Sequence, residues 1–393
     1  MNSQKRQRVV CGMSGGVDSS TAAALLVEQG YDVIGVTLKL WKQDCFSPAQ
    51  DLFKCCGSRA MADVRAVCDH LGIPFHMIDD AEEFQKEVIS RFAAEYRAGR
   101  TPNPCILCNE HLKFGTLLQR ADQFGAQYVA TGHYARIERA SPGSAGVSSA
   151  NTQENGGRRD AGPPRFVAQS RGEARHLLKR GRDPRKDQSY FLFSLRQDQL
   201  ARALFPVGDQ TKSDTREAAR QRELKTAEKK ESMEICFVPD KDYGKFLREA
   251  NLAQKHRGEI VDLHGRVLGH HDGIEFYTIG QRKGLGITTP KPVYVIELDA
   301  ANNRVVVGDD SALDRDEFTV ERCNWIPFEA PPVKIEATVK IRYNHPGTPA
   351  TVTPQDNGSA KVKLHLAQRA ITPGQAAVFY QDDLVVGGGW ICR

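Results

Sequence analysis

Long hydrophobic runs are missing from this sequence of 393 residues, and no stretch approaches the ~18 consecutive apolar residues that a membrane helix needs. Residues 1–10, MNSQKRQRVV, are basic but lead directly into a short apolar strand, without the hydrophobic core or cleavage site of a signal peptide. The 10 cysteines are too sparse for a disulfide scaffold in a chain of this length. These absences argue against membrane and secreted proteins, so the sequence predicts a cytoplasmic protein without a membrane partner.

The N-terminal third alternates strand-like and helix-like patterns. Apolar strands are expected at RVVCGM, DVIGVTLKLW, PFHMIDD and AQYVATGHY, and helices at 18–29, 58–71, 82–98 and 112–124. Strands that alternate with helices are typical of a parallel sheet covered on both faces. The sequence therefore predicts an α/β fold with a doubly wound parallel sheet.

Further along the chain, both the amino-acid composition and the spacing of apolar residues change. Half of the residues at 141–164 are Gly, Pro or Ser, and this segment is predicted to be a disordered surface insertion because it cannot bury enough apolar surface. From about Gly273 apolar residues alternate with polar ones, most clearly in VKIEATVKIRY and AKVKLHL. In the first of these the predicted inward face runs from Val333 to Tyr343. Such alternation predicts a small β-barrel.

Basic residues gather in two successive segments. Residues 165–186 contain eight Lys and Arg against two acidic residues, a local charge of +6 in a chain whose net charge is +5. Further basic residues follow at 212–230 on a helical pattern. Either segment alone is best interpreted as a solvated face, but two in succession favour a surface that binds a polyanion.

A glycine loop, SGGVDSS at residues 14–20, follows the first strand and precedes the first helix. Glycines and a helix N-terminus present backbone N–H groups to an anion, and phosphate is the natural ligand. The lysine of GxxxxGK[ST] is missing, and so is the GxGxxG pattern of dinucleotide sites. The alternative is a plain glycine turn capped by Ser14 or Asp18.

Three cysteines lie in segments where a thiol could act as a nucleophile. Cys105 and Cys108 form a CxxC between a proline-containing turn and a helix start, and Cys236 ends a basic helical pattern. A thiol near a helix N-terminus or near lysines has a lowered pKa and is a better nucleophile. No second CxxC or HxxxH completes a zinc site. Two thiols from distant segments suit sulfur transfer, in which one carries a persulfide and the other attacks it.

The motifs in this sequence resemble those of known protein families. SGGVDSS resembles the loop of the ATP-pyrophosphatase (PP-loop) superfamily, whose enzymes hold the leaving pyrophosphate of ATP while an oxygen is adenylated. The whole chain resembles the bacterial tRNA-specific 2-thiouridylase family, which makes 2-thiouridine at the wobble position, position 34, of tRNA. The motifs that carry this second resemblance are GMSGGVDSS, AGRTPNPCILCN, ATGHYAR, KDQSYFLF, LFPVGD, ICFVPD, TIGQRKGLGI, KIRY and TPGQAAVFY.

The resemblance implies a domain division and a reaction. It implies a catalytic PP-loop domain, placed at 1–210 with the insertion at 141–164, a small central domain at 211–275 and a tRNA-binding β-barrel at 276–393. The activity would be that of a tRNA-uridine 2-sulfurtransferase that adenylates the C2 oxygen and then transfers sulfur. ATP and Mg²⁺ would be required, and the partners would be tRNA and a sulfur-donor protein that carries a persulfide.

The resemblance also assigns residues by motif. Cys236 would carry the persulfide, and Cys108 would be the nucleophile that forms a disulfide with it during turnover. The ATP site would comprise Gly12, Met13, Ser14, Gly15, Gly16, Val17, Asp18, Ser19, Leu38 and Gly132. The target base would be bordered by Asn103, Pro104 and Cys105. Contacts to tRNA would come from His133, Lys186, Asp187, Gln188, Arg342, Tyr343 and Gln375.

One position departs from the family pattern and leaves alternatives open. Some relatives have Asp where Cys105 stands, and a third thiol here could join Cys108 and Cys236 in holding a [4Fe-4S] cluster that carries the sulfur. A different adenylating synthetase with the same loop is a further alternative. It would need a glutaminase partner or domain and would have no need for Cys236.

Overall fold

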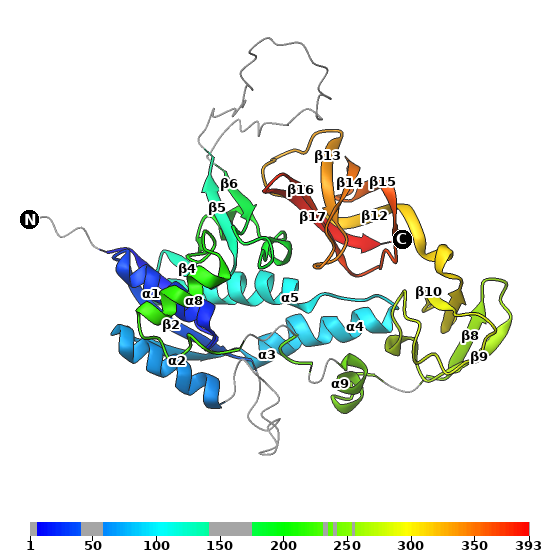
Figure 1. Ribbon diagram of the computed structural model, residues 1–393, viewed down its shortest axis with the longest axis horizontal. Helices are drawn as coiled ribbons and strands as arrows, with labels where there is room; N and C mark the ends of the chain where they lie inside the picture. The colour runs from blue at the N-terminus through cyan, green and yellow to red at the C-terminus, as the bar shows by residue number, and fades with distance from the viewer. Residues whose placement is uncertain are drawn as a thin grey trace, which may run out of the picture.

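The computed structural model describes residues 6–40, 58–140, 175–230, 235–238, 242–253 and 256–392 (Figure 1). The predicted insertion at 141–164 and the first ten residues of the basic segment at 165–174 lie outside these described residues. Among the described residues, no helix combines the length and the apolar character that crossing a membrane requires.

A five-stranded parallel sheet forms the N-terminal part, in the order β3-β2-β1-β4-β7. Its strands are β1 (Arg8–Gly12), β2 (Asp32–Lys39), β3 (Phe75–Asp79), β4 (Tyr128–Ala130) and β7 (Ala203–Leu204), and each neighbouring pair is parallel. The strand order reverses at β1, so a crevice is expected beside the carboxyl ends of β1 and β4. This crevice is where an open α/β sheet binds its ligand.

Helices cover both faces of this sheet, and the alternation of side chains along β1 shows how. Val9 and Cys11 pack with α1 (Val17–Glu28) and α2 (Ser58–Leu71) in one apolar cluster. Val10 points the other way, into a second cluster with Phe84 and Phe92. The doubly wound prediction is therefore confirmed, because successive residues of a buried strand face opposite layers.

The second layer consists of two long helical segments. The first runs through α3 (Ala81–Phe84), η2 (Gln85–Ser90) and α4 (Arg91–Arg97), and the second through α5 (Pro104–Leu107), η3 (Cys108–Thr116) and α6 (Leu117–Gln123). The second helix begins at Pro104 rather than at the predicted residue 112. Asn103 caps it by accepting a 3.2 Å hydrogen bond from the backbone N–H of Cys105, and proline is favoured at the first helical position.

The C-terminal part is a closed barrel, as the alternation predicts. Its order is β12-β15-β14-β13-β16-β17, and a further pairing of β12 with β17 closes it. The strands are β12 (Asp314–Trp325), β13 (Ile335–Lys340), β14 (Thr348–Pro354), β15 (Ala360–Arg369), β16 (Ala376–Gln381) and β17 (Leu384–Cys392). Ile335 and Val339 are buried inside it, but Val333 is 83% exposed, because it precedes the strand.

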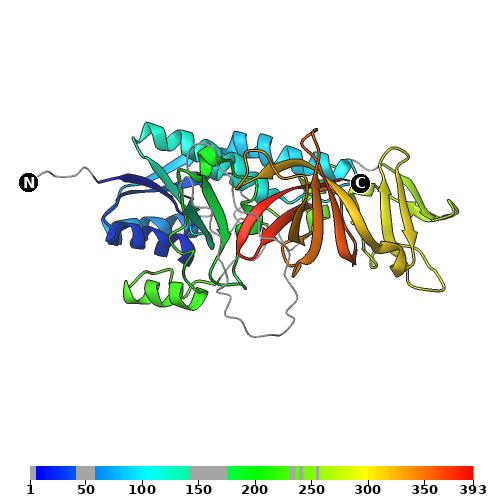
Figure 2. The same cartoon turned by 90° about the horizontal axis from the view of Figure 1, so that it is seen from above.

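A four-stranded sheet lies between the two parts in sequence. Its strands are β8 (Gly258–Asp262), β9 (Val267–His271), β10 (Tyr294–Asp299) and β11 (Arg304–Gly308), in the order β10-β11-β8-β9. In both views this sheet lies at the end of the molecule farthest from the N-terminus, with the barrel between it and the parallel sheet (Figures 1 and 2). The predicted domain limits at 210 and 275 stay predictions.

Two short strands tie the barrel to the N-terminal part. β5 (Ala135–Arg139) follows β4 and pairs with β6 (His176–Arg180), which in turn pairs with β17 at Leu384. The remaining helical segments are α7 (Gln197–Leu200), α8 (Lys212–Gln221), α9 (Tyr243–Glu249), η4 (Ser189–Phe191), η6 (Ile274–Phe276) and η7 (Asp310–Leu313).

Candidate active site

The glycine loop connects the carboxyl end of β1 to the N-terminus of α1. Gly15 has a φ of +72°, and a Cβ at this position would lie 2.8 Å from the carbonyl oxygen of Ala60, so both the conformation and the space require glycine. The N-cap of α1 is Gly16, and no side chain caps the helix within the described residues. The alternative of a turn capped by Ser14 or Asp18 is therefore wrong, and no described side chain occupies the first N–H groups of α1, which follow the carboxyl end of β1.

The other residues predicted for ATP lie at the same edge of the sheet. Leu38 stands next to the end of β2, and Gly132 follows β4 closely. A Cβ on Gly132 would come within 2.6 Å of the backbone of Asp18 and Ser19, so only glycine lets this loop approach the first turn of α1. The structure thus brings the residues from Gly12 to Ser19 together with Leu38 and Gly132.

The carboxylate of Asp18, in the first turn of α1, has two partners from elsewhere in the chain. The hydroxyl of Tyr134 donates to Asp18 Oδ1 at 2.8 Å, and Lys212 Nζ lies 2.6 Å from the same oxygen. Lys212 is the first residue of α8, and 194 residues separate it from Asp18. A cation therefore stands beside a loop whose own sequence lacks one.

The CxxC lies on the capped helix described above. Cys105 is in its first turn and Cys108 is where the helix changes to π-type hydrogen bonding, an irregularity often found at functional sites. Burial raises the pKa of Cys105 to about 11, with a smaller contribution in the same direction from Cys108. Cys105 is therefore a neutral thiol at pH 7. The lowered pKa that the sequence suggests for a thiol at a helix start does not apply to this residue, because desolvation outweighs the helix terminus.

The next residue, Asn109, connects this helix to the segment that follows Gln188. Its side chain is 2% exposed, and its Nδ2 donates to the carbonyl of Phe191 at 3.0 Å. The ring of Phe191 in turn lies 4.4 Å, centroid to centroid, from the ring of Tyr343 at the barrel. A continuous set of contacts thus joins the barrel to the residue beside Cys108.

Cys236 lies in a turn rather than at the end of a helix, since α8 ends at Gln221. Its neighbour Phe237 is 2% exposed and packs edge to face on Phe84 at 5.7 Å and on Phe92 at 5.2 Å. Cys108 and Cys236 are both half-buried and pack against the same apolar cluster. The two segments that carry these thiols therefore rest on one helical layer.

None of the three thiols takes part in a disulfide in this structure, and they do not form a site for a metal. Among the described residues, no three His, Cys, Asp or Glu side chains are grouped so that they could hold a metal ion. Cys105, Cys108 and Cys236 therefore do not fit an iron–sulfur cluster in this arrangement, because such a cluster needs its thiolates to converge.

Of the residues predicted to contact tRNA, Asp187 and His133 are buried and Gln188 is half-buried, and all three are engaged by protein groups. Asp187 is 5% exposed, and its Oδ1 accepts from the backbone N–H groups of Gly181 and Ser189 at 3.1 and 3.0 Å. The side chain of Gln188 accepts from the backbone N–H of Tyr134 at 2.9 Å. His133 is 8% exposed and its Nδ1 lies 2.7 Å from Thr131 Oγ1. In this structure these side chains hold the segments of the site together.

The other predicted tRNA residues lie nearer the surface. Arg342 is exposed, while Lys186 and Tyr343 are half-buried. Gln375 donates from its Nε2 to the carbonyl of Thr101 at 2.8 Å. Since Thr101 stands two residues before Asn103, this barrel residue fixes the loop that leads to the predicted base-binding residues.

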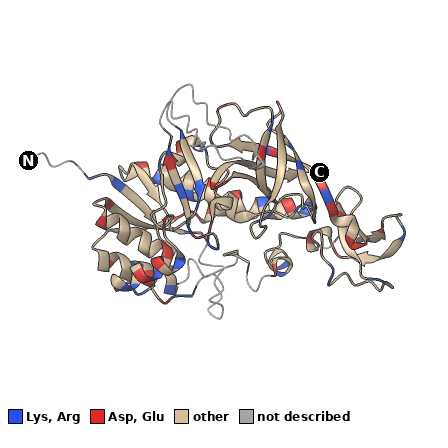
Figure 3. Cartoon of the chain, turned by 45° about the horizontal axis from the view of Figure 1, so that its top comes forward, with Lys and Arg blue, Asp and Glu red and all other residues tan. Residues whose placement is uncertain are grey.

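Charge of both signs is interspersed along the parallel-sheet part and the barrel (Figure 3). The described part of the first basic segment includes Lys179, which pairs with Glu138 at 2.5 Å, and Arg180, which lies 3.5 Å from Asp187. Arg182 and Arg185 are exposed. The local excess of positive charge is therefore smaller at the surface than the sequence count suggests.

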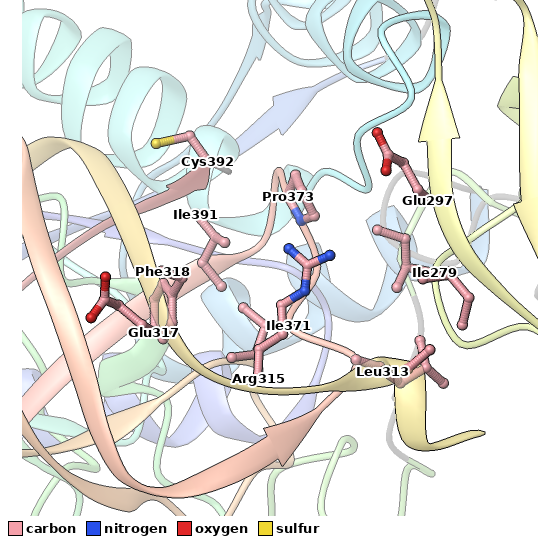
Figure 4. Close-up of a pocket in the computed structure, with 13 residues that line it drawn as sticks. Ile279, Glu297, Leu313, Arg315, Glu317, Phe318, Ile371, Pro373, Ile391 and Cys392 are labelled. Carbon is pink, nitrogen blue, oxygen red and sulfur yellow. The ribbon is translucent and has the colours of Figure 1, made fainter. Parts of the chain in front are cut away.

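A cavity of about 110 Å³ lies at the seam between the barrel and the central sheet (Figure 4). Apolar side chains such as Leu313, Phe318 and Ile371 line it, with Arg315 and Glu317 from β12. None of the residues predicted for ATP, the target base or tRNA lines this cavity. The cavity is therefore separate from the residues predicted for the site.

Sequence reasoning missed Lys212, Asn109 and Phe237. Lys212 is one of many basic residues in the sequence, although it follows the LFPVGD motif by three residues. Asn109 and Phe237 each follow a predicted catalytic cysteine directly, so their position next to Cys108 and Cys236 was a usable signal.

Comparisons with known proteins agree with this architecture. Three family models match successive parts of the chain: "tRNA methyl transferase HUP domain" at 7–240, "tRNA methyl transferase PRC-barrel domain" at 244–309 and "Aminomethyltransferase beta-barrel domain" at 315–391. A solved NMN synthetase from Francisella tularensis matches over 33% of this chain and 46% of its own. Its TM-score of 0.21 and identity of 21% are too low to support a conclusion about the fold or function of this chain.

Curated relatives are similar over the full length. A protein of Geotalea uraniireducens is 45% identical, covering 100% of this chain and 96% of its own, and one of Clostridium acetobutylicum is 45% identical, covering 98% and 99%. A protein of Geobacter metallireducens is also 45% identical over 100% of this chain. All three are named tRNA-specific 2-thiouridylase MnmA. With this identity over its whole length, the chain belongs to the tRNA-specific 2-thiouridylase family.

Proposed function

We propose that this protein is an enzyme that uses ATP to replace the C2 oxygen of the wobble uridine of tRNA, position 34, with sulfur. The observation that carries the proposal is the N-terminus of α1, which no described side chain caps, in a chain whose Cys108 and Cys236 are free of disulfides and pack against one apolar cluster. The first feature suits pyrophosphate, and the second suits sulfur transfer. Membership of the tRNA-specific 2-thiouridylase family supports both pyrophosphate binding and sulfur transfer.

The first step is adenylation. The N–H groups at the start of α1 bind the β- and γ-phosphates of ATP, and the C2 oxygen of the uridine attacks the α-phosphorus. A bond from this oxygen to phosphorus forms, the bond to the bridging oxygen breaks, and pyrophosphate leaves with the electron pair. Mg²⁺ would enter with the phosphates of ATP and offset their charge, and the carboxylate of Asp18 is the hard oxygen donor beside the loop.

The second step is sulfur transfer. The terminal sulfur of a persulfide on Cys236, supplied by a donor protein, attacks C2, and AMP leaves with the former C2 oxygen. Cys108 then attacks the sulfur of Cys236, which breaks the S–S bond to the transferred sulfur and leaves a Cys108–Cys236 disulfide for an external reductant. In an alternative order, Cys108 attacks the inner sulfur of Cys236 first, which forms the Cys108–Cys236 disulfide and releases hydrosulfide, and the hydrosulfide then attacks C2 while AMP leaves.

The tRNA is held by the barrel and by the β5–β6 region. Exposed Arg342, with Lys186, contributes phosphate contacts, and the anticodon base enters near Asn103, Pro104 and Cys105. The base must leave its stack to expose C2, as other enzymes that modify bases require. Because Gln375 holds the carbonyl of Thr101, the barrel also positions the loop that leads to the base site.

The direct test supplies the full chain with ATP, tRNA and a persulfide donor, and measures nucleosides by mass after nuclease digestion. We expect 2-thiouridine that depends on ATP and maps to position 34. If ATP is cleaved to AMP and pyrophosphate without any thiolated base, while an amide product forms from an added nitrogen donor, the chain is another PP-loop synthetase. An iron assay on anaerobically prepared protein addresses the cluster alternative.

A further inference from the structure

The glycine loop lacks the lysine that other phosphate loops carry within their own motif. In the folded chain a lysine reaches this position from elsewhere. Lys212 Nζ lies 2.6 Å from Asp18 Oδ1, in the first turn of α1, the helix that follows the glycine loop. Its side chain is 12% exposed, so its position is set by the protein rather than by solvent.

Several contacts fix the backbone from which this side chain extends. The N–H of Lys212 donates to Asp183 Oδ2 at 3.0 Å, and Asp183 is 5% exposed. Thr211 caps α8 by accepting from the N–H of Asp214 at 3.2 Å, while Asp214 Oδ2 accepts from the N–H of Thr211 at 2.9 Å. The start of α8 is therefore anchored on two sides, and the lysine side chain has a defined origin.

The surroundings of the ammonium group also orient it. The ring of Tyr134 lies 5.7 Å from Lys212 Nζ, and the hydroxyl of the same residue donates to Asp18. Tyr134 follows Gly132, whose missing side chain allows the close approach to α1. The loop after β4, the first turn of α1 and the first residue of α8 thus meet around one carboxylate.

A purely structural role explains this ion pair poorly. The helices α1 and α8 are already joined at their other ends, where Arg222 Nη2 pairs with Glu28 Oε2 at 2.6 Å. A second pair adds little stability where it is exposed, and it costs desolvation where it is buried. What distinguishes the Lys212–Asp18 pair from the Arg222–Glu28 pair is its place in the first turn of α1, directly after the glycine loop.

We propose that Lys212 supplies the missing cation of the phosphate loop and contacts the pyrophosphate portion of ATP. This inference rests on the proposed adenylation. When the bond between the α-phosphorus and the bridging oxygen breaks, the electron pair leaves with pyrophosphate, and the ammonium group offsets that charge without giving up its proton. Asp18 is the counter-ion that holds Lys212 in place before the nucleotide binds.

The test compares the binding of three probes by titration calorimetry to the full chain: inorganic pyrophosphate, ATP and AMP. Lys212→Met keeps the hydrocarbon stem without the charge, and Lys212→Arg keeps the charge. We expect Lys212→Met to bind pyrophosphate and ATP at least tenfold more weakly and AMP unchanged, and Lys212→Arg to recover most of the loss. The rate of pyrophosphate release with tRNA should fall about 100-fold in Lys212→Met, the size seen when one preorganised donor to a developing charge is removed.

The matched control is Glu28→Gln, which breaks the ion pair at the other end of the same two helices and should leave all three affinities unchanged. Unaltered pyrophosphate binding in Lys212→Met would overturn the inference, and so would an equal loss for AMP, which would indicate a structural role. Failure of the proposed function gives a different result, in which the unmodified chain binds ATP but never thiolates tRNA. A thermal melting scan of each variant separates unfolding from loss of binding.

Discussion

Single residues explain why the glycine loop can hold an anion although it carries no lysine. Gly15 and Gly132 leave room that any side chain would fill, and Gly16 starts α1 without a side-chain cap. The sequence pattern of a strand, a glycine loop and a helix was sufficient to predict an anion site at Gly15 and Gly16, whereas Gly132 was assigned only through the family resemblance. The pattern was not sufficient to predict the cation, since Lys212 reaches Asp18 across 194 residues.

We expect the proposed phosphate site to depend on the carboxylate of Asp18. Asp18→Ala should abolish tRNA-dependent release of pyrophosphate, because Lys212 loses its counter-ion and the loop loses its hard oxygen donor. Release is measured with a coupled pyrophosphate assay at saturating ATP. Ser213→Ala, at an exposed position of α8, is a suitable control, and an Asp18→Ala enzyme with full activity would contradict the site.

His133 gives a prediction for pH. Burial, with a smaller effect of Lys113, lowers the pKa of His133 well below its ordinary value of 6.5, so it stays neutral in the folded protein. The unfolded chain takes up a proton as the pH falls below 6.5, and the folded chain does not. Above pH 6.5 this group therefore does not lower the free energy of unfolding. Below that pH the free energy of unfolding falls, by up to about 1.4 kcal/mol for each pH unit.

The check is a comparison of thermal midpoints between pH 7.5 and pH 5.5. Between pH 7.5 and pH 5.5 we expect the thermal midpoint to fall further in the unmodified chain than in His133→Gln. The variant lacks the group that takes up a proton in the unfolded chain. Equal losses in both proteins would show that His133 is protonated in the folded state.

At the scale of elements, the alternation of apolar residues predicted the parallel sheet and the barrel correctly, because each buried face repeats regularly along the chain. The predicted start of the CxxC helix is too late, although Asn103 and Pro104 are ordinary signals of a helix start. Cys236 lies in a turn and not at the predicted helix end, since aromatic packing around Phe237, rather than a local pattern, determines its position.

The aromatic packing of Phe237 leads to a prediction about the Cys236 turn. Phe237→Ala should cost about 3–5 kcal/mol where the ring is buried, because the missing ring leaves a cavity. Because the ring holds the turn against Phe84 and Phe92, we expect 2-thiouridine formation to fall far more than pyrophosphate release. Both products are measured in the same reaction. Phe246→Leu, in the same aromatic group but on α9, is the control for general loosening, and an equal fall of both products would contradict the idea of a locally anchored turn.

At the scale of the whole molecule, the barrel is joined to the catalytic part at several points. Arg136 pairs with Asp383 at 2.7 Å where β6 meets β17, and Gln375 and Tyr343 contact the segments beside the CxxC. The closure of the barrel by β12 and β17, and these contacts between domains, could not be predicted from the sequence, because they join residues that no local pattern relates.

The whole-molecule account predicts how tRNA binding depends on salt. Reversing Lys186 and Arg342 to Glu should weaken binding and flatten the plot of log affinity against log salt, by about one unit of slope for each phosphate that the variant no longer neutralises. Affinity is measured by filter binding or anisotropy across a series of KCl concentrations. Reversing Lys245 on α9 serves as a charge-matched control. A slope that does not change in the Lys186 and Arg342 variants would show that these side chains are solvated surface.

The measurement that tests the central claim most directly is an anaerobic single-turnover reaction of Cys236→Ser and Cys105→Asp with ATP, tRNA and a persulfide donor, with pyrophosphate and 2-thiouridine followed together. The account predicts that Cys236→Ser still releases pyrophosphate but forms no 2-thiouridine, because a hydroxyl cannot carry a persulfide. Cys105→Asp should retain substantial thiolation, because in the proposed mechanism this thiol only borders the base. Undiminished thiolation by Cys236→Ser, or loss of both thiolation and bound iron in Cys105→Asp, would contradict the account.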